Sequence, residues 1–167
     1  MKKLVSLALI LGLASIALAG DTKDAAKPNM AAMMAEMNKC AVCKNMASKL
    51  DAIGPMSMEV VNLNNGMAIS HSVKDMSKLP IYHAASDACA KAGQACATMT
   101  DAQVKTDLCS FCQEIHGVMK SGGNMSMGKT KTGDLMVITS NDPAVQKRIT
   151  GMAEKCAMMA GMMQASN

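Results

Sequence analysis

The residues best suited to chemistry in this chain are two Cys-x-x-Cys pairs. Cys40 and Cys43 enclose Ala-Val, and Cys109 and Cys112 enclose Ser-Phe. On a helix, such spacing places the two sulfurs about one turn apart on the same side. Each pair can therefore close a disulfide, chelate a soft metal ion or cycle between thiol and disulfide. The two pairs together could also form one four-cysteine site.

The two pairs belong to a longer repeat. A shift of 69 residues carries Cys40 onto Cys109, Met56-Ser-Met58 onto Met125-Ser-Met127, and the strand-like segment from Met67 onto the one from Met136. After a two-residue deletion, Cys89 corresponds to Cys156. Because self-similarity at a fixed period marks a repeated structural unit, we predict a tandem duplication. The predicted repeats span residues 29–97 and 98–167.

This alignment gives each repeat three cysteines. It favours two separate groups over one shared site: Cys40, Cys43 and Cys89 in one, and Cys109, Cys112 and Cys156 in the other. Cys96 has no counterpart, and seven cysteines leave at least one unpaired in a monomer. Metal ligation would use an odd number of thiols, since three cysteines and one histidine form a known Zn²⁺ ligand set.

Two histidines are the preferred candidates for a fourth ligand, and His83 is an alternative to His71 in the first repeat. His116 follows Cys112 by four residues, which is one helical turn. His71 lies on the strand face predicted for Met67 and Ile69, beside possible sulfur ligands. Neither histidine recurs in the other repeat, so a hydrogen-bonded core or rim position is the alternative for each.

Methionine is unusually abundant: 19 follow Met1 (20 − 1). Methionine is a flexible core filler, but its thioether is also a soft ligand that, with thiolates, selects Cu(I). A stripe at helical spacing near the C-terminus predicts packing, and it comprises Val145, Ile149, Met152, Cys156, Met159 and Met163. Other methionines lie two residues apart on predicted strands, where they could bind or pack: Met56 and Met58, Met125 and Met127.

The first 19 residues read as a secretory signal peptide. Lys2 and Lys3 precede an apolar run that ends in Ala17-Leu18-Ala19, the small-x-small pattern of a cleavage site. We therefore expect an exported protein, periplasmic or secreted, with no membrane segment after cleavage. Residues 20–28 are expected to form a flexible mature terminus. The sequence makes no prediction of the oligomeric state of the protein.

Charge and composition exclude several classes of function. The formal charge of +4 falls to +2 without Lys2 and Lys3, and the only aromatic residues are Tyr82 and Phe111. This argues against nucleic-acid binding, which uses basic patches and stacking. The chain has no phosphate loop, nucleophile elbow or His-Glu-x-x-His motif, so no enzyme is predicted. The acidic residues, Asp134 included, are expected on solvated faces.

Hydrophobic periodicity predicts the order helix, strand, strand, helix in each repeat. The first repeat is predicted to contain a helix over 29–50, strands over 56–63 and 67–73 around a turn at Asn64-Asn65-Gly66, and a helix over 75–97. The second is predicted to contain a helix over 101–120, strands over 125–131 and 135–139, and a final helix to 164. Both Cys-x-x-Cys pairs then lie inside helices, which disfavours a thioredoxin-like site. The fold class is α+β: tandem αββα units whose hairpins form one antiparallel sheet covered by helices.

Three functions follow from these patterns. The first is an exported protein that binds a soft or borderline metal, Cu(I) before zinc, for buffering, storage or delivery, with the ion or a metal-handling protein as partner. The second is a disulfide-stabilised interaction module without enzymatic activity. The third is a thiol-disulfide redox protein or an oxidant scavenger.

Overall fold

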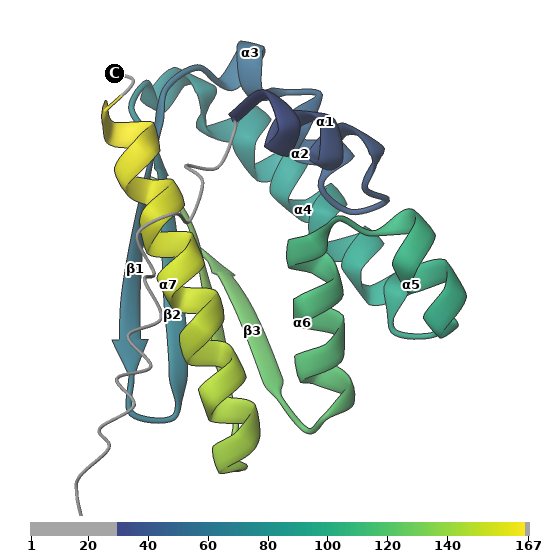
Figure 1. The fold of residues 1–167 in the computed structure, drawn as a ribbon. Coiled ribbons are helices and arrows are strands. Elements are labelled where there is room, and N and C mark those ends of the chain that lie inside the picture. The colour runs from purple at the N-terminus through teal and green to yellow at the C-terminus, as the bar shows by residue number, and fades with distance from the viewer. Residues whose placement is uncertain (1–29, 166–167) are drawn as a thin grey trace, which may run out of the picture.

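The structure is a computed structural model that describes residues 30–165 (Figure 1). The predicted signal peptide (1–19) and mature terminus (20–28) lie outside the described residues. The first half contains helices α1 (Met30–Lys39), α2 (Lys44–Ala47) and α3 (Leu50–Ile53), strands β1 (Met56–Leu63) and β2 (Gly66–Val73), the short 3-10 helix η2 (Met76–Lys78) and helix α4 (Leu79–Cys96). The second half contains helices α5 (Asp101–Asp107) and α6 (Ser110–Lys120), strands β3 (Asn124–Lys129) and β4 (Gly133–Thr139), and helix α7 (Pro143–Ala165).

One antiparallel sheet joins the two halves of the chain. Its strand order is β1-β2-β4-β3, so each hairpin contributes two strands and the hairpins meet where β2 pairs with β4. The β1–β2 hairpin turns at Asn64-Asn65, as the sequence predicted. The α+β class and the shared sheet are therefore confirmed. The order helix, strand, strand, helix occurs in both halves, while their origin by duplication stays a prediction.

Two glycines allow the hairpins to meet. At Gly133 on β4, a Cβ atom would overlap the carbonyl oxygen of His71 and lie 2.8 Å from its carbonyl carbon. At Gly66 on β2, a Cβ atom would overlap the carbonyl oxygen of Ile138 and lie 2.8 Å from the Cα of Thr139. Because the obstructing atoms are backbone, no side-chain rotation relieves the overlap. These two positions therefore set how closely β2 and β4 approach.

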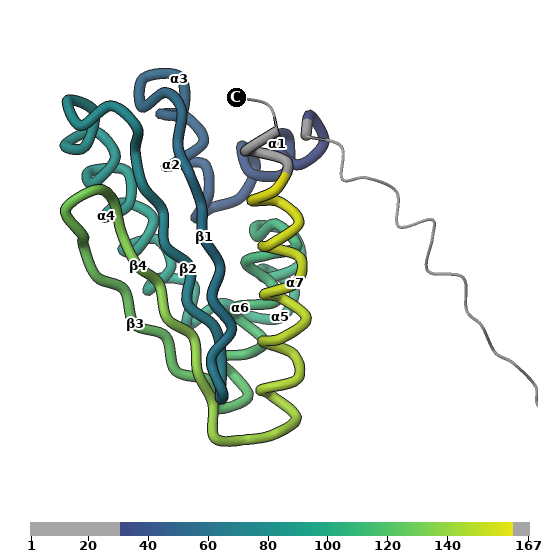
Figure 2. Tube along the Cα trace, turned by 90° about the vertical axis from the view of Figure 1, so that its left-hand side faces the viewer, coloured from purple at the N-terminus to yellow at the C-terminus, as the bar shows by residue number. Residues whose placement is uncertain are grey.

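The main core lies between one face of the sheet and helices α6 and α7 (Figure 2). The predicted C-terminal stripe forms the α7 side of this core: Val145, Ile149, Met152 and Cys156 are buried, and Met159 packs against them. The sheet contributes Met58, Met67, Ile69 and Ile138. Asp142 directly precedes helix α7 and caps it, because its carboxylate accepts hydrogen bonds from the N–H groups of Ala144 and Val145 at 2.7 and 3.3 Å. Methionine acts here as core filler.

Two predicted helices are interrupted, and both interruptions fall at a Cys-x-x-Cys motif. The helix predicted over 29–50 ends as α1 at Lys39 and resumes as α2 at Lys44. The helix predicted over 101–120 breaks at Leu108, which is extended (φ −112°, ψ 141°). Because of this break, Val104 and Leu108 pack with Cys40, Cys96 and Cys112 in a second, smaller core, which we call the cysteine cluster. Phe111, Ile115 and Val118 face the main core instead. Placing the motifs inside continuous helices was wrong.

Asp134 is buried, contrary to the expectation that it is solvated. It is 5% exposed and lies on β4 directly opposite His71 on β2. Its carboxylate receives hydrogen bonds from His71 Nδ1 (3.1 Å), from Ser86 Oγ (2.6 Å) and from Tyr82. Burial alone would raise the pKa of Asp134, but these donors outweigh it and hold the pKa below its ordinary value. The network ties α4 to the centre of the sheet.

We expect Asp134→Asn to destabilise the protein by about 1–3 kcal/mol at pH 7, since it weakens several buried hydrogen bonds at once. A lowered folded-state pKa means that the carboxylate contributes stability above its unfolded pKa, which is about 3.9, and loses it as the pH falls through the folded-state value. Urea unfolding of both proteins from pH 7 downward checks this. The gap between them should close only in acid, and a gap independent of pH would contradict the assignment.

Within residues 30–165, no helix is long and apolar enough to cross a membrane.

Candidate metal centre

The two Cys-x-x-Cys motifs meet in space. The Sγ atoms of Cys40, Cys43, Cys109 and Cys112 all lie within 4.8 Å of one another. Cys43 Sγ lies 3.7 Å from Cys109 Sγ and 3.4 Å from Cys112 Sγ. No disulfide is formed by any of the seven cysteines, all of which fall within the described residues. The structure therefore forms one four-cysteine group from both halves of the chain, in place of the two three-cysteine groups that the repeat alignment favoured.

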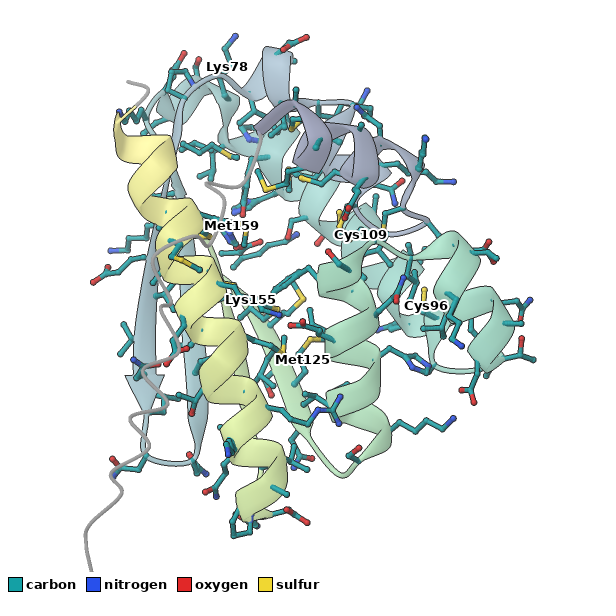
Figure 3. The ribbon with its side chains drawn as sticks, viewed as in Figure 1. Lys78, Cys96, Cys109, Met125, Lys155 and Met159 are labelled. Atoms are coloured by element: carbon teal, nitrogen blue, oxygen red, sulfur yellow. The ribbon has the colours of Figure 1, made fainter. Side chains whose placement is uncertain are left out.

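Helix ends position all four sulfurs. The N–H group of Cys40 donates to Glu36 O at 3.0 Å, so Cys40 closes the last turn of α1. Cys43 precedes α2, Cys109 is the N-cap of α6, and Cys112 lies in the first turn of α6. Figure 3 shows Cys109 at the end of α6 that faces α1 and α2. The interruptions of the predicted helices are what bring the two motifs face to face.

A backbone hydrogen bond fixes the two motif loops against each other. The N–H group of Ala41, inside the first motif, donates to Asp107 O at 2.8 Å, at the end of α5. The Ser110 hydroxyl donates to Glu36 at 3.1 Å across the same junction. The loops are thus held in place by bonds that do not involve sulfur, which keeps the four thiols close together without a disulfide.

The spacing of the sulfurs suits one tetrahedrally bound ion. Four sulfurs at about 2.3 Å from a Zn²⁺ ion would lie about 3.8 Å from one another. The separations of 3.4 and 3.7 Å, with an upper limit of 4.8 Å, surround that value. A disulfide needs sulfurs at about 2.05 Å, so these separations are too long for covalent pairing. The group could hold a metal ion once its sulfur–sulfur separations change by no more than about 1 Å.

Hydrogen bonds within the group lower the pKa of one thiol and raise the pKa of two others. Hydrogen bonds from Cys112 and Cys43 hold the pKa of Cys109 at about 2, and the Cys112 N–H adds to the effect. The same bonds, first with Cys109 and then with Cys43, raise the pKa of Cys112, and burial adds to this. The bond with Cys109 is also the main reason that the pKa of Cys43 is raised. In the metal-free group the thiolate is therefore favoured at Cys109 over Cys43 and Cys112, and metal binding must release the protons of those two thiols.

The group is closed on one side and accessible on the other. Cys40 and Cys112 are buried, at 1% and 9% exposure, whereas Cys43 and Cys109 are half-buried. Four protein ligands fill a tetrahedral ion and leave no position for a substrate, which is the arrangement of a structural site. The half-buried sulfurs offer the route by which an ion or a chelator could enter.

The other three cysteines lie outside this group. Cys156 is 1% exposed within the main core, and burial raises its pKa to about 11. Cys89 is half-buried on α4, and its thiol donates to Val42 O at 3.5 Å. Cys96 packs in the cysteine cluster and donates to Ala92 O at 3.2 Å. Burial raises the pKa of both Cys89 and Cys96, so all three are poor nucleophiles.

Neither candidate histidine joins the four sulfurs. His71 is held by Asp134, and His116 is half-buried on α6, one turn beyond Cys112. Among residues 30–165, the four cysteines are the one group of three or more Cys, His, Asp or Glu ligands that converge. The sequence allows one four-cysteine group, but alignment of the repeats favours two three-cysteine groups. The sequence offers no signal for the role of Asp134, because its contact with His71 arises only from the pairing of β2 with β4.

Comparisons with protein-family models, with curated proteins and with solved structures find no match to this chain.

Proposed function

We propose that this chain is an exported, non-enzymatic metal-binding protein that holds one Zn²⁺ ion in its four-cysteine group. The observation that carries the proposal is the convergence of four free thiols from two distant segments at tetrahedral spacing. The secretory pattern of residues 1–19 supports export. The absence of an open coordination position in a tetrathiolate site supports a role in holding an ion rather than in catalysis.

We put zinc ahead of copper in this proposal because of the ligand set, which reverses the order expected from methionine content. A tetrahedral arrangement of four sulfurs is typical of zinc or iron, while Cu(I) selection draws on thioethers as well as thiolates. The converging ligands are all cysteine. Met99 packs against the cluster that contains Cys40 and Cys112, but it is not one of the converging ligands.

The ion would cross-link two distant segments in the helical part of the molecule. The core there is small and consists largely of cysteine: Cys40, Cys96, Val104, Leu108 and Cys112. This cross-link joins Cys43 and Cys112, which lie 69 residues apart in the sequence. By the loop-closure relation used for disulfides, a link of this length stabilises the fold by about 4 kcal/mol. Exchange through the half-buried Cys43 and Cys109 would allow loading from, or delivery to, a metal-handling protein.

Elemental analysis tests the proposal. The protein is purified under reducing conditions without chelator and measured for zinc, copper and iron, with its thiols counted in parallel. We expect about one zinc per chain. Protein that stays metal-free when offered zinc, with its thiols reduced, would overturn the proposal, and one copper or iron per chain would overturn the choice of ion.

A thiol-disulfide redox function is the second candidate, because one observation favours it. Cys109 is the N-cap of α6, and hydrogen bonds from Cys112 and Cys43 lower its pKa, which favours the thiolate at neutral pH. A thiolate at a helix N-terminus in a Cys-x-x-Cys motif is the arrangement of disulfide oxidoreductases. In such a reaction Cys109 and Cys112 would lose two electrons and two protons to a disulfide substrate, which becomes two thiols. Turnover of a disulfide by metal-free protein, lost in Cys109→Ser, would favour this function over zinc binding.

A further inference from the structure

Three methionines lie together at one edge of the sheet. Met127 on β3 is the direct partner of Met136 on β4, and Met125 is the partner of Ile138, two residues further along β4. Since side chains two residues apart point to the same face of a strand, all three methionines share one face. The pairing of β3 with β4, rather than the sequence spacing, brings Met136 to the other two.

The three thioethers are within reach of a common point. Directly opposite residues in an antiparallel pair have Cβ atoms about 5 Å apart, and diagonal neighbours are about 7–8 Å apart. Methionine sulfur lies two bonds beyond Cβ on a side chain with three rotatable bonds. The sulfurs of Met125, Met127 and Met136 can therefore converge on one ion placed between the two strands.

Two of the three methionines are also exposed to solvent. Met125 and Met127 are 37% and 44% exposed, while Met136 is half-buried against the main core. In the view of Figure 3, Met125 is seen between α6 and α7. Exposed strand positions ordinarily favour β-branched or aromatic residues, so strand propensity does not explain methionine at Met125 and Met127. Ligand binding explains both their side chain and their exposure.

The charge nearby does not oppose a cation. Lys129, on the same face of β3, pairs with Asp87 at 2.7 Å. The Lys129 ammonium is thereby paired with a carboxylate, and the thioethers are the groups proposed to bind the cation at this edge.

From this placement we propose a second metal site, in which Met125, Met127 and Met136 bind a soft monovalent cation, Cu(I) or Ag(I). Uncharged thioethers favour soft ions with low charge and offer little to Zn²⁺ or to hard cations. The site is separate from the four-cysteine group and requires none of its residues. The chain would then carry two kinds of metal site, a closed one built from thiolates and an open one built from thioethers.

Nuclear magnetic resonance of methionine methyl groups tests the site directly. The full chain, labelled at the methionine methyls, is titrated with Ag(I), which undergoes no redox reaction with the protein under these conditions. Thiolates take up the first equivalents, and methyl signals then report thioether binding alone. We expect the methyls of Met125, Met127 and Met136 to shift together at about tenfold lower free silver than those of Met76 and Met158. The last two are equally exposed, at 48% and 53%, and serve as internal controls.

Met127→Leu should abolish the early shift of the two remaining methyls, and Met158→Leu should leave all three unchanged. Backbone amide spectra confirm that each variant is folded, and Met125→Leu replaces Met127→Leu if that variant is not. Shifts of the three methyls that come no earlier than those of Met76 and Met158 would overturn the proposal, as would an early shift that survives loss of Met127. Neither result depends on whether the cysteines bind zinc.

Discussion

Replacing Cys112 with serine is expected to remove zinc from the protein and to loosen its helical part. Cys112 is the most buried of the α6 ligands, and its sulfur lies 3.4 Å from that of Cys43. Loss of even a hydrogen-bond partner of a metal ligand commonly costs about 10- to 100-fold in affinity, so loss of the ligand itself should cost more than about a hundredfold. Competition with a chromophoric chelator at pH 7 measures the change.

The same substitution should lower the melting temperature of the zinc-loaded protein by on the order of 10 °C, given about 4 kcal/mol from loop closure. Chelator should reproduce this fall in the wild-type protein and have little further effect on Cys112→Ser. Cys89→Ser is the matched control, since Cys89 is a half-buried cysteine outside the group and its hydroxyl replacement can keep the bond to Val42. Equal loss of zinc from both variants would contradict the four-cysteine assignment.

Gly133→Ala is expected to be a strongly destabilising substitution in the sheet. The added methyl group would overlap the backbone of His71 across the β2–β4 pair, so the two hairpins must move apart. Separation would also strain the buried Asp134–His71 contact next to it. Destabilisation by about 2–4 kcal/mol follows from overpacking combined with lost pairing. Urea unfolding measures it from the transition midpoint.

The chain supplies a control within the same sheet. Gly128 lies on β3, where an added Cβ would meet nothing within 4 Å. Gly128→Ala should therefore be neutral, or stabilising by a few tenths of a kcal/mol through reduced freedom of the unfolded chain. If Gly133→Ala lowers the free energy of unfolding no more than Gly128→Ala does, then β2 and β4 do not pair as closely as the structure indicates.

The sheet and the last helix could be predicted because local signals and tertiary packing agree there. Alternation and the Asn64-Asn65 turn define the first hairpin, and the stripe from Val145 to Met159 defines the buried side of α7. The interruption at Leu108 could not be predicted in this way. Its apolar residues continue at helical spacing through Phe111 and Val118, and only packing divides them between two clusters.

The candidate site was predicted residue by residue but not as a group. Both Cys-x-x-Cys pairs stand out in the sequence, but alignment of the repeats compares equivalent positions and does not reveal contacts between the halves. Cys89 and Cys156 are equivalent by that alignment, yet one lies beside Val42 and the other in the main core. The meeting of Cys43 with Cys112 depends on helix breaks and on the bond from Ala41 to Asp107, which are tertiary features.

X-ray absorption at the zinc edge of the loaded, full-length protein tests the central claim most directly, because it counts the atoms bound to the ion. We predict a single shell of four sulfur atoms at about 2.3 Å, with no nitrogen or oxygen ligand. A shell that contains histidine nitrogen or water oxygen, or fewer than four sulfurs, would contradict a closed site built from Cys40, Cys43, Cys109 and Cys112.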